Sequence, residues 1–154
     1  GYPGGPEIAR RSENAINNKF SFPRPMINSN DYNFSFSGLK THVINTVQKI
    51  ELTDKSINNI SFELQDSIVE TLISKSIKAA QDHRIKNIVV TGGVSANNRL
   101  RDKFSQVSNH DVFFPDVKFS TDNGAMIAYA GFLKHRSSDI EKNFRIKPNP
   151  SLTL

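Results

Sequence analysis

The residues best suited to bind a ligand form one short segment, Gly92-Gly93-Val94-Ser95-Ala96-Asn97. A glycine pair lets a ligand approach the backbone closely, and the free N–H groups at the start of a following helix attract anions. The Asn97 side chain offers both a donor and an acceptor, which suits a ribose or a base. The same residues also suit a tight strand-to-helix turn capped by Ser95 or Asn97, so the motif leaves both interpretations open.

A second glycine pair, Gly4-Gly5, precedes a predicted helix near the beginning of the chain. Pro6 suits the first turn of a helix, and Glu7 suits the positive end of the helix dipole. The argument for anion binding applies here as well. It is weaker, because a glycine pair flanked by prolines also makes an ordinary turn.

Asp122 follows two hydroxyl residues and opens a predicted helix, so its ordinary role is that of an N-cap. Its carboxylate is also a possible metal ligand, but a metal needs further ligands. The chain has no cysteine, and no two of its four histidines are separated by four positions. A complete metal site made by this chain alone is therefore not expected.

Hydrophobic spacing predicts alternating strands and helices, which is typical of an α/β layered fold. We expect Ser37 to cap a helix, and Lys75 and Lys78 to lie on the solvent side of the longest helix. The predicted elements are a helix from about Pro6, a loop over 20–33, a short strand over 33–37, a helix over 39–50, a polar link over 51–59, a long helix over 60–83, a buried strand over 87–91, a helix through Phe104, a strand over 112–114 and a helix after Gly124.

The composition bounds the function only loosely. A chain of 154 residues suits one domain, with residues 1–136 as the folded segment and 137–154 as a polar, partly disordered tail. Residues 78–154 carry the whole net charge of +5, which permits contact with a polyanion but is also ordinary for solubility. No apolar run has the length of a membrane span, and we expect a cytoplasmic protein without a membrane partner.

Taken together, the motifs resemble one family, the tRNA N6-adenosine threonylcarbamoyltransferases. The resemblance is to the C-terminal part of the family and extends from residue 2 to about 135. Any one motif is weak, but their order and spacing make the match specific. The motifs are YPGGPEIA, FPRPM, FSFSGLKT, GGVSANNRLR and STDNGAMIAYAGF.

The resemblance implies the second lobe of a two-lobed actin/Hsp70/sugar-kinase-like (RNase H-like) α/β fold. It implies transfer of a threonylcarbamoyl group from threonylcarbamoyl-AMP to N6 of the tRNA adenine adjacent to the anticodon. Gly5 and Asn97 match family residues that bind the adenylate. Asp122 matches an aspartate that holds one divalent metal ion, iron or zinc. The resemblance identifies no catalytic base in this chain.

The chain also departs from the family pattern. The HxxxH histidines that complete the metal site, and the first lobe, would precede Gly1, and Ala9 stands where many members have an acidic residue. We therefore expect a chain that is inactive without an N-terminal lobe. The family's other partners are a paralogous small subunit and an ATPase subunit. The alternative is a non-catalytic remnant or interaction module of the same fold that binds adenylate or a partner.

Overall fold

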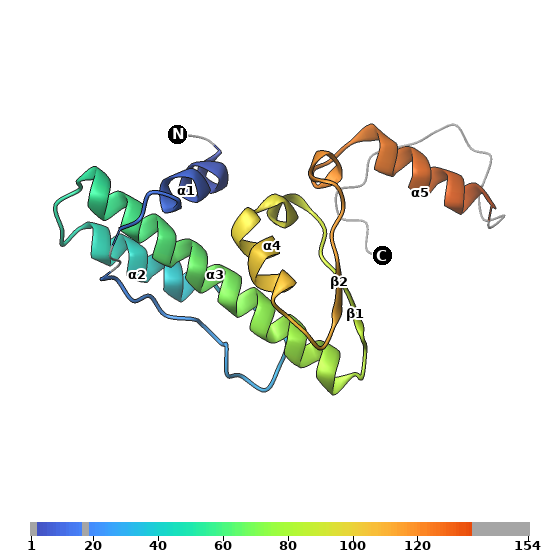
Figure 1. Ribbon diagram of the computed structural model, residues 1–154, viewed down its shortest axis with the longest axis horizontal. Coiled ribbons are helices and arrows are strands. Elements are labelled where there is room, and N and C mark those ends of the chain that lie inside the picture. The colour runs from blue at the N-terminus through green and yellow to red at the C-terminus, as the bar shows by residue number, and fades with distance from the viewer. Residues whose placement is uncertain (1–2, 17–18, 137–154) are drawn as a thin grey trace. The chain divides into compact units, whose positions relative to one another are not determined.

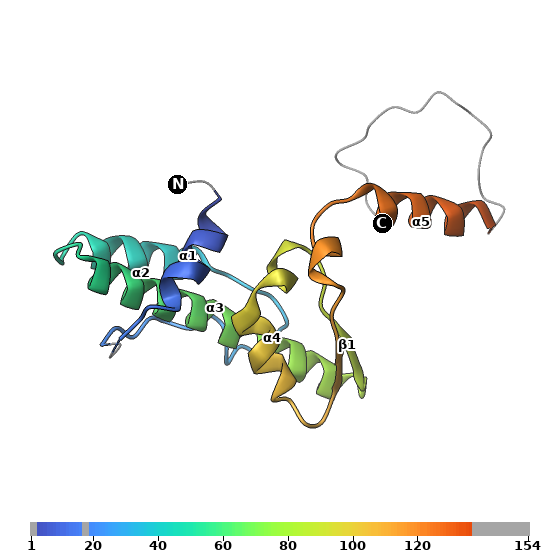
Figure 2. The same cartoon turned by 45° about the horizontal axis from the view of Figure 1, so that its top comes forward.

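The computed structural model describes residues 3–16 and 19–136. The chain divides into two compact units, Gly1–Thr121 and Asp122–Leu154. Each unit is treated by itself. The predicted tail, 137–154, lies outside the described residues, so the division at residue 136 stays a prediction. In chain order the elements are α1 Gly4–Ser12, α2 Ser37–Val47, α3 Asp54–Asp82, β1 Asn87–Val89, the 3₁₀ turn η1 Gly93–Ala96, α4 Asn98–Ser105, β2 Asp111–Phe113, the 3₁₀ turn η2 Val117–Phe119 and α5 Gly124–Arg136 (Figures 1 and 2).

The expected mixed α/β class is confirmed, with a small parallel sheet. β1 and β2 pair in parallel, with Ile88 opposite Val112 and Val89 opposite Phe113. The two strands are joined through α4, as a parallel connection requires. Ile88 and Val112 pack against a buried cluster that includes Phe104 and belongs to α3 and α4.

The expectation of a fully buried strand over 87–91 was wrong. β1 covers only Asn87–Val89, and its side chains alternate between exposed and half-buried. Val89 is 70% exposed and its neighbour Phe113 is 53% exposed, because the described residues cover only one face of the sheet. A run of β-branched residues predicts a strand, but its burial depends on layers that sequence periodicity does not reveal.

α3 is the central element of the first unit and is longer than expected (Figure 1). The predicted polar link over 51–59 was wrong, because the helix already begins at Asp54. Thr53 caps it: the Thr53 hydroxyl accepts from the Ser56 amide, and the Ser56 hydroxyl accepts from the Thr53 amide. This reciprocal capping box lets a polar segment start a helix.

The predicted strand over 33–37 was also wrong. Residues 33–36 pair with no strand in the described part of the chain, and Phe36 has ψ 5°, which is not extended backbone. Phe34 and Phe36 stack on each other at 6.4 Å between ring centroids, which accounts for their alternation without a sheet. α2 begins at Ser37 itself, so Ser37 is its first residue rather than its cap.

The segment between α1 and α2 runs alongside α3 and is tied to it by polar contacts (Figure 1). The Phe22 amide donates to the Glu63 carboxylate at 3.1 Å, and the Ser67 hydroxyl donates to the Pro23 carbonyl at 2.5 Å. Phe22 also packs with Leu39 and Ile60 in a second buried cluster. A loop without regular structure is held in place in this way by one long helix.

The expectation that Lys75 faces solvent was wrong. Its side chain is 1% exposed. The ammonium group donates to the Ser29 hydroxyl at 2.6 Å, to the Asp31 carbonyl at 2.8 Å and to the Asp31 carboxylate at 3.0 Å. All three donors of the lysine thus have acceptors on the segment that crosses α3, which makes burial of its charge tolerable.

Candidate functional site

The segment Gly92–Asn97 forms a strand-to-helix turn. Gly92 has φ 85° and ψ 176°, a conformation that is practically confined to glycine. Gly93 has an ordinary backbone, and a Cβ built on it would meet no atom within 4 Å. Gly92 is therefore explained by the turn. Neither φ nor crowding among the described residues explains Gly93, which leaves its outer side open to an approaching molecule.

Asn97 rather than Ser95 caps α4. The Asn97 Oδ1 accepts from the Leu100 amide at 3.0 Å. Ser95 is fully buried, and its hydroxyl donates to the Ser120 hydroxyl at 3.0 Å. The turn is further fixed by Arg101, whose Nε donates to the Ser95 carbonyl at 2.6 Å. The cap that the motif left open is thus decided by the structure.

The other end of the Asn97 amide enters a partly buried chain of hydrogen bonds. Asn97 Nδ2 donates to Gln65 Oε1 at 2.8 Å, and Gln65 Nε2 donates to Ser12 Oγ at 2.8 Å. Ser12 Oγ in turn donates to the Ala9 carbonyl at 2.6 Å. The chain crosses α3 and connects the cap of α4 with the last turn of α1. Gln65 and Ser12 did not stand out in the sequence, because a lone glutamine on a helix and a lone serine at a helix end carry no motif.

The expectation that the glycine pair precedes the helix was wrong: α1 begins at Gly4, and Gly5 lies in its first turn. A Cβ on Gly5 would also meet no atom within 4 Å. Glycine weakens a helix by roughly 0.5–1 kcal/mol relative to alanine, so open space on this side gives no structural reason for it. Ser12, at the opposite end of the same helix, lies roughly 10 Å along the axis from Gly5. The structure thus links α1 to Asn97 through its far end rather than through Gly5.

Asp122 precedes α5 and is exposed. The expectation that it caps this helix was wrong: Asn123 Oδ1 accepts from the Met126 amide at 2.9 Å and is the cap. Asp122 is therefore not needed for that role. No group of three or more His, Cys, Asp or Glu among the described residues is placed to hold a metal ion.

A charged cluster joins α3, α4 and the preceding loop. The Asp66 carboxylate accepts from Arg99, and the Glu70 carboxylate accepts from Arg24 and Lys103. Partial burial raises the pKa of Asp66, but hydrogen bonds from Lys103 and Arg99 outweigh it and leave the pKa below its usual value. The Lys103 hydrogen bond also lowers the pKa of Glu70, against the opposing effect of burial. These cations are held by acidic partners on α3.

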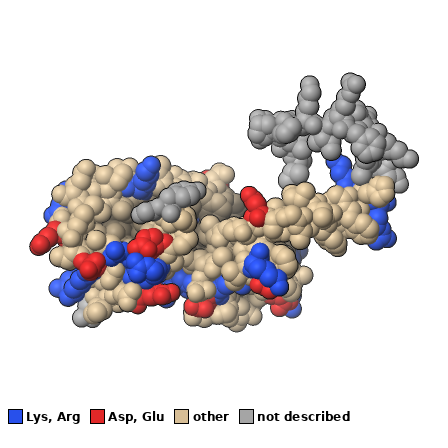
Figure 3. Space-filling model, turned by 90° about the horizontal axis from the view of Figure 1, so that it is seen from above, with Lys and Arg blue, Asp and Glu red and all other residues tan. Residues whose placement is uncertain are grey.

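The surface of the first unit does not gather its cations into one patch on the face seen in Figure 3. Blue and red side chains are interspersed there. A nucleic-acid surface is expected to concentrate positive charge, since phosphate neutralisation drives such binding. This face therefore gives no support to RNA contact from charge alone.

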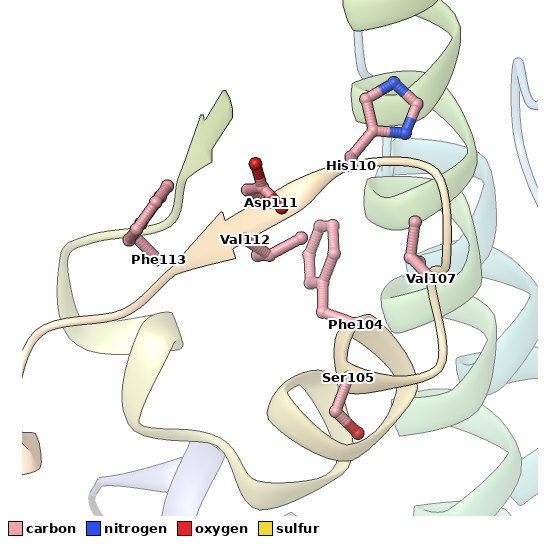
Figure 4. Close-up of a pocket in the computed structure, with 7 residues that line it drawn as sticks. All are labelled: Phe104, Ser105, Val107, His110, Asp111, Val112 and Phe113. Carbon is pink, nitrogen blue, oxygen red and sulfur yellow. The ribbon is translucent and has the colours of Figure 1, made fainter. Parts of the chain in front are cut away.

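The surface hollows in the described part of the chain include two that are not lined by Gly5, Asn97 or Asp122. One, of about 390 Å³, lies between α4 and β2 and is shown in Figure 4. Within it the buried His110 Nδ1 has no hydrogen-bond partner among the described residues. The other, of about 640 Å³, lies between the end of α1 and the start of α3. No described helix is long and apolar enough to cross a membrane.

Comparison with known proteins identifies the chain over most of its length. The family model for TsaD, tRNA N6-adenosine threonylcarbamoyltransferase, matches residues 1–129. A relative of that name from Thermosipho africanus is 45% identical over 100% of this chain and 47% of its own length. One from Ralstonia pickettii is 43% identical over 87% of this chain and 41% of its own length. A third, from Buchnera aphidicola, is 39% identical over 100% of this chain and 46% of its own length.

The chain thus spans about half the length of the curated relatives that it matches. The match includes both glycine pairs, the Asn97 turn and Asp122, the residues that the motifs had singled out. The family resemblance expected from those motifs is confirmed. The chain belongs to the tRNA N6-adenosine threonylcarbamoyltransferase family, a family of enzymes.

Proposed function

We propose that this chain is the C-terminal part of an enzyme that transfers a threonylcarbamoyl group from threonylcarbamoyl-AMP to N6 of the tRNA adenine adjacent to the anticodon. In this proposal the chain is part of the second lobe of the actin/Hsp70-like fold and provides one wall of an adenylate site, in the cytoplasm. The observation that carries it is the open side of Gly93, between the positive-φ turn at Gly92 and the Asn97 cap.

The chemistry of these elements fits an adenylate. Backbone N–H groups at the start of a helix attract phosphate, and α1 and α4 both begin beside a glycine pair or a glycine turn. Glycines without Cβ contacts let a flat base or a phosphate approach the backbone. The Asn97 side chain makes two hydrogen bonds within the protein, and neither uses its second amide hydrogen. This hydrogen is available to an acceptor atom of the ligand.

In the proposed reaction the exocyclic N6 amine attacks the carbamoyl carbon. A bond forms between N6 and that carbon, the bond from carbon to the phosphate oxygen breaks, AMP leaves, and N6 loses a proton. The chain's part is to hold the adenylate so that AMP is a positioned leaving group. We assign no general base to this chain.

Asp122 is proposed as one ligand of a divalent metal ion, iron or zinc. The described residues do not form a complete site, so the other ligands would come from the histidines of an N-terminal lobe. A bound metal would polarise oxygen atoms of the substrate. The exposure of Asp122 and its freedom from capping support this role, because its carboxylate lacks the structural task first expected of it.

A second candidate function is a non-catalytic interaction module of the same fold. The observation in its favour is the uncovered sheet face, where Val89 and Phe113 are both exposed. Such apolar surface suits contact with another protein segment. An N-terminal lobe of the enzyme is one such segment, and the small paralogous subunit and the ATPase subunit are the other proposed partners.

The test is reconstitution of transferase activity. The chain alone should not modify tRNA, and the chain combined with an N-terminal half of a relative that carries HxxxH should do so. Asp122→Asn in the combined protein should lower the amount of bound metal. It should also lower activity by at least roughly 100-fold, if the metal stabilises the charge of the transition state by a few kcal/mol. Metal is measured by elemental analysis and modified adenosine by mass spectrometry.

The matched control is Asn123→Ser, since serine caps a helix about as well as asparagine and leaves α5 capped. It should retain metal and activity. Activity of the chain alone would contradict the need for a second lobe. Full metal content in Asp122→Asn would remove the metal assignment, and an inactive combined protein with normal AMP binding would favour the interaction module.

A further inference from the structure

The hydrogen-bond chain between α4 and α1 has only one possible direction. The Leu100 amide can only donate, so the atom of Asn97 that faces it at 3.0 Å must be the oxygen. The Asn97 nitrogen therefore faces Gln65, at 2.8 Å from its oxygen. A backbone group thus fixes which way the Asn97 amide points, and Asn97 in turn fixes the orientation of Gln65.

The far end of the chain gives the same direction independently. The Ala9 carbonyl can only accept, so the Ser12 hydroxyl donates to it at 2.6 Å and accepts from Gln65 Nε2 at 2.8 Å. The Gln65 nitrogen must then face Ser12 and its oxygen must face Asn97. Both ends agree, so neither amide can flip without leaving two like atoms in contact.

Burial makes this arrangement costly to change. Ser12 is 6% exposed and Gln65 is 9% exposed, so neither can exchange its partner freely for water. A buried polar group that loses its partner destabilises the fold, because no water replaces the lost hydrogen bond. α1 and α4 have no direct hydrogen bond in the described residues, and Gln65 on α3 is the side chain that joins them.

We propose that Gln65 is a positioning residue that holds Asn97 ready to donate a hydrogen bond to the adenylate. This inference rests on the proposed adenylate site. Gln65 accepts one hydrogen of Asn97 Nδ2, and the cap occupies Asn97 Oδ1. Asn97 then donates its second amide hydrogen to the ligand. The ligand atom that it contacts is an acceptor, such as a hydroxyl oxygen, a ring nitrogen or a phosphate oxygen. Ser12 keeps Gln65 in the required orientation.

The first experiment needs no ligand. In ¹⁵N-labelled chain, one hydrogen of the Asn97 side-chain amide should be protected from exchange with solvent, and Gln65→Met should abolish that protection. Methionine matches glutamine in length but accepts no comparable hydrogen bond. Gln81→Met, on an exposed position of the same helix, is the control and should leave the signal unchanged. An unprotected Asn97 amide in the unmodified chain would overturn the inference.

The second experiment measures AMP binding by NMR titration of the same proteins. Gln65→Met should weaken AMP binding about tenfold. Asn97→Asp retains the cap but has no amide hydrogen, and should weaken AMP at least as much. Because Gln65 acts through Asn97, the double variant should bind no more weakly than Asn97→Asp alone. Multiplied losses in the double variant would overturn the inference.

Gln65→Glu covers the case in which Gln65→Met does not fold. The carboxylate still accepts from Asn97, so the Asn97 amide should stay protected and AMP affinity should fall less than threefold. Loss of protection in folded Gln65→Glu would contradict the inference. If the unmodified chain binds no AMP while the Asn97 amide behaves as expected, the adenylate site fails and the orientation of Asn97 by Gln65 stands.

Discussion

Two adjacent glycines differ in what they do. Gly92 adopts φ 85°, where a side chain is strained, and Gly93 has neither an unusual φ nor a crowded Cβ position. The sequence presents them as one pair. Only the backbone conformation separates the glycine that the turn requires from the glycine that leaves room beside it.

We therefore expect Gly92→Ala to lower the free energy of unfolding by about 1–3 kcal/mol and Gly93→Ala to change it by less than about 0.5 kcal/mol. Gly93→Ala should instead weaken AMP binding, because its methyl group enters the space proposed for the ligand. Urea unfolding and NMR titration measure the two effects. Equal destabilisation by both substitutions would show that Gly93 is also a structural glycine.

The buried lysine gives the fold a dependence on acid. A hydrogen bond from Lys75, helped by the Ser29 hydroxyl, lowers the pKa of Asp31 from 3.8 to about 2. Because the folded pKa lies below the unfolded one, the ionised Asp31 stabilises the fold above about pH 4. That contribution disappears as the pH falls from about 4 to about 2.

Asp31→Asn should therefore lower stability at pH 7, and its difference from the unmodified chain should shrink toward zero near pH 2. Urea midpoints at pH 7, 4, 3 and 2 measure this. Glu7, whose pKa the Arg10 and Arg11 hydrogen bonds lower to about 2, titrates in both proteins and cancels in the comparison. A difference that stays constant over this range would contradict the role of the charge.

At the scale of elements, the capping box of α3 decides where the longest helix begins. Thr53 and Ser56 exchange side-chain and backbone hydrogen bonds, and the helix extends into a polar segment that hydrophobic periodicity excludes. Residues that cap a helix are polar and lie outside its apolar stripe. This is why the start of α3 was predicted six residues late.

Thr53→Ala should cost about 1 kcal/mol of stability, and Thr53→Asp should restore most of it, since both threonine and aspartate cap helices. Thr41→Ala, on an exposed position within α2, should change stability by less than about 0.5 kcal/mol. Thermal unfolding followed by circular dichroism compares the variants. An unchanged midpoint in Thr53→Ala would mean that packing rather than capping fixes the start of α3.

At the scale of the whole molecule, the sheet has one covered and one uncovered face. Ile88 and Val112 pack toward the cluster of α3 and α4, and their neighbours Val89 and Phe113 are exposed. The chain spans about half the length of the curated relatives that it matches. We expect the stability of the chain to depend on the covered face of the sheet and not on the exposed face.

We expect Val112→Ala to lower stability by about 1–3 kcal/mol and Val89→Thr to change it by less than about 0.5 kcal/mol. Val89→Thr with Phe113→Ser should also reduce self-association, because exposed apolar surface promotes it. Urea unfolding and sedimentation velocity measure these effects. A large loss of stability in Val89→Thr would show that the outer face is covered in solution.

Ordered motifs and hydrophobic spacing are local properties, so they predicted the family and the α/β class correctly and singled out the glycine pairs, Asn97 and Asp122 as candidates. The tertiary structure decided which polar residues are buried: Lys75 is covered by a loop some 44 residues away, and Gln65 joins Ser12 to Asn97 across α3. It also decided that Asn123 rather than Asp122 caps α5. A side chain's role depends on the partner that folding brings to it, and no spacing along the chain encodes that partner.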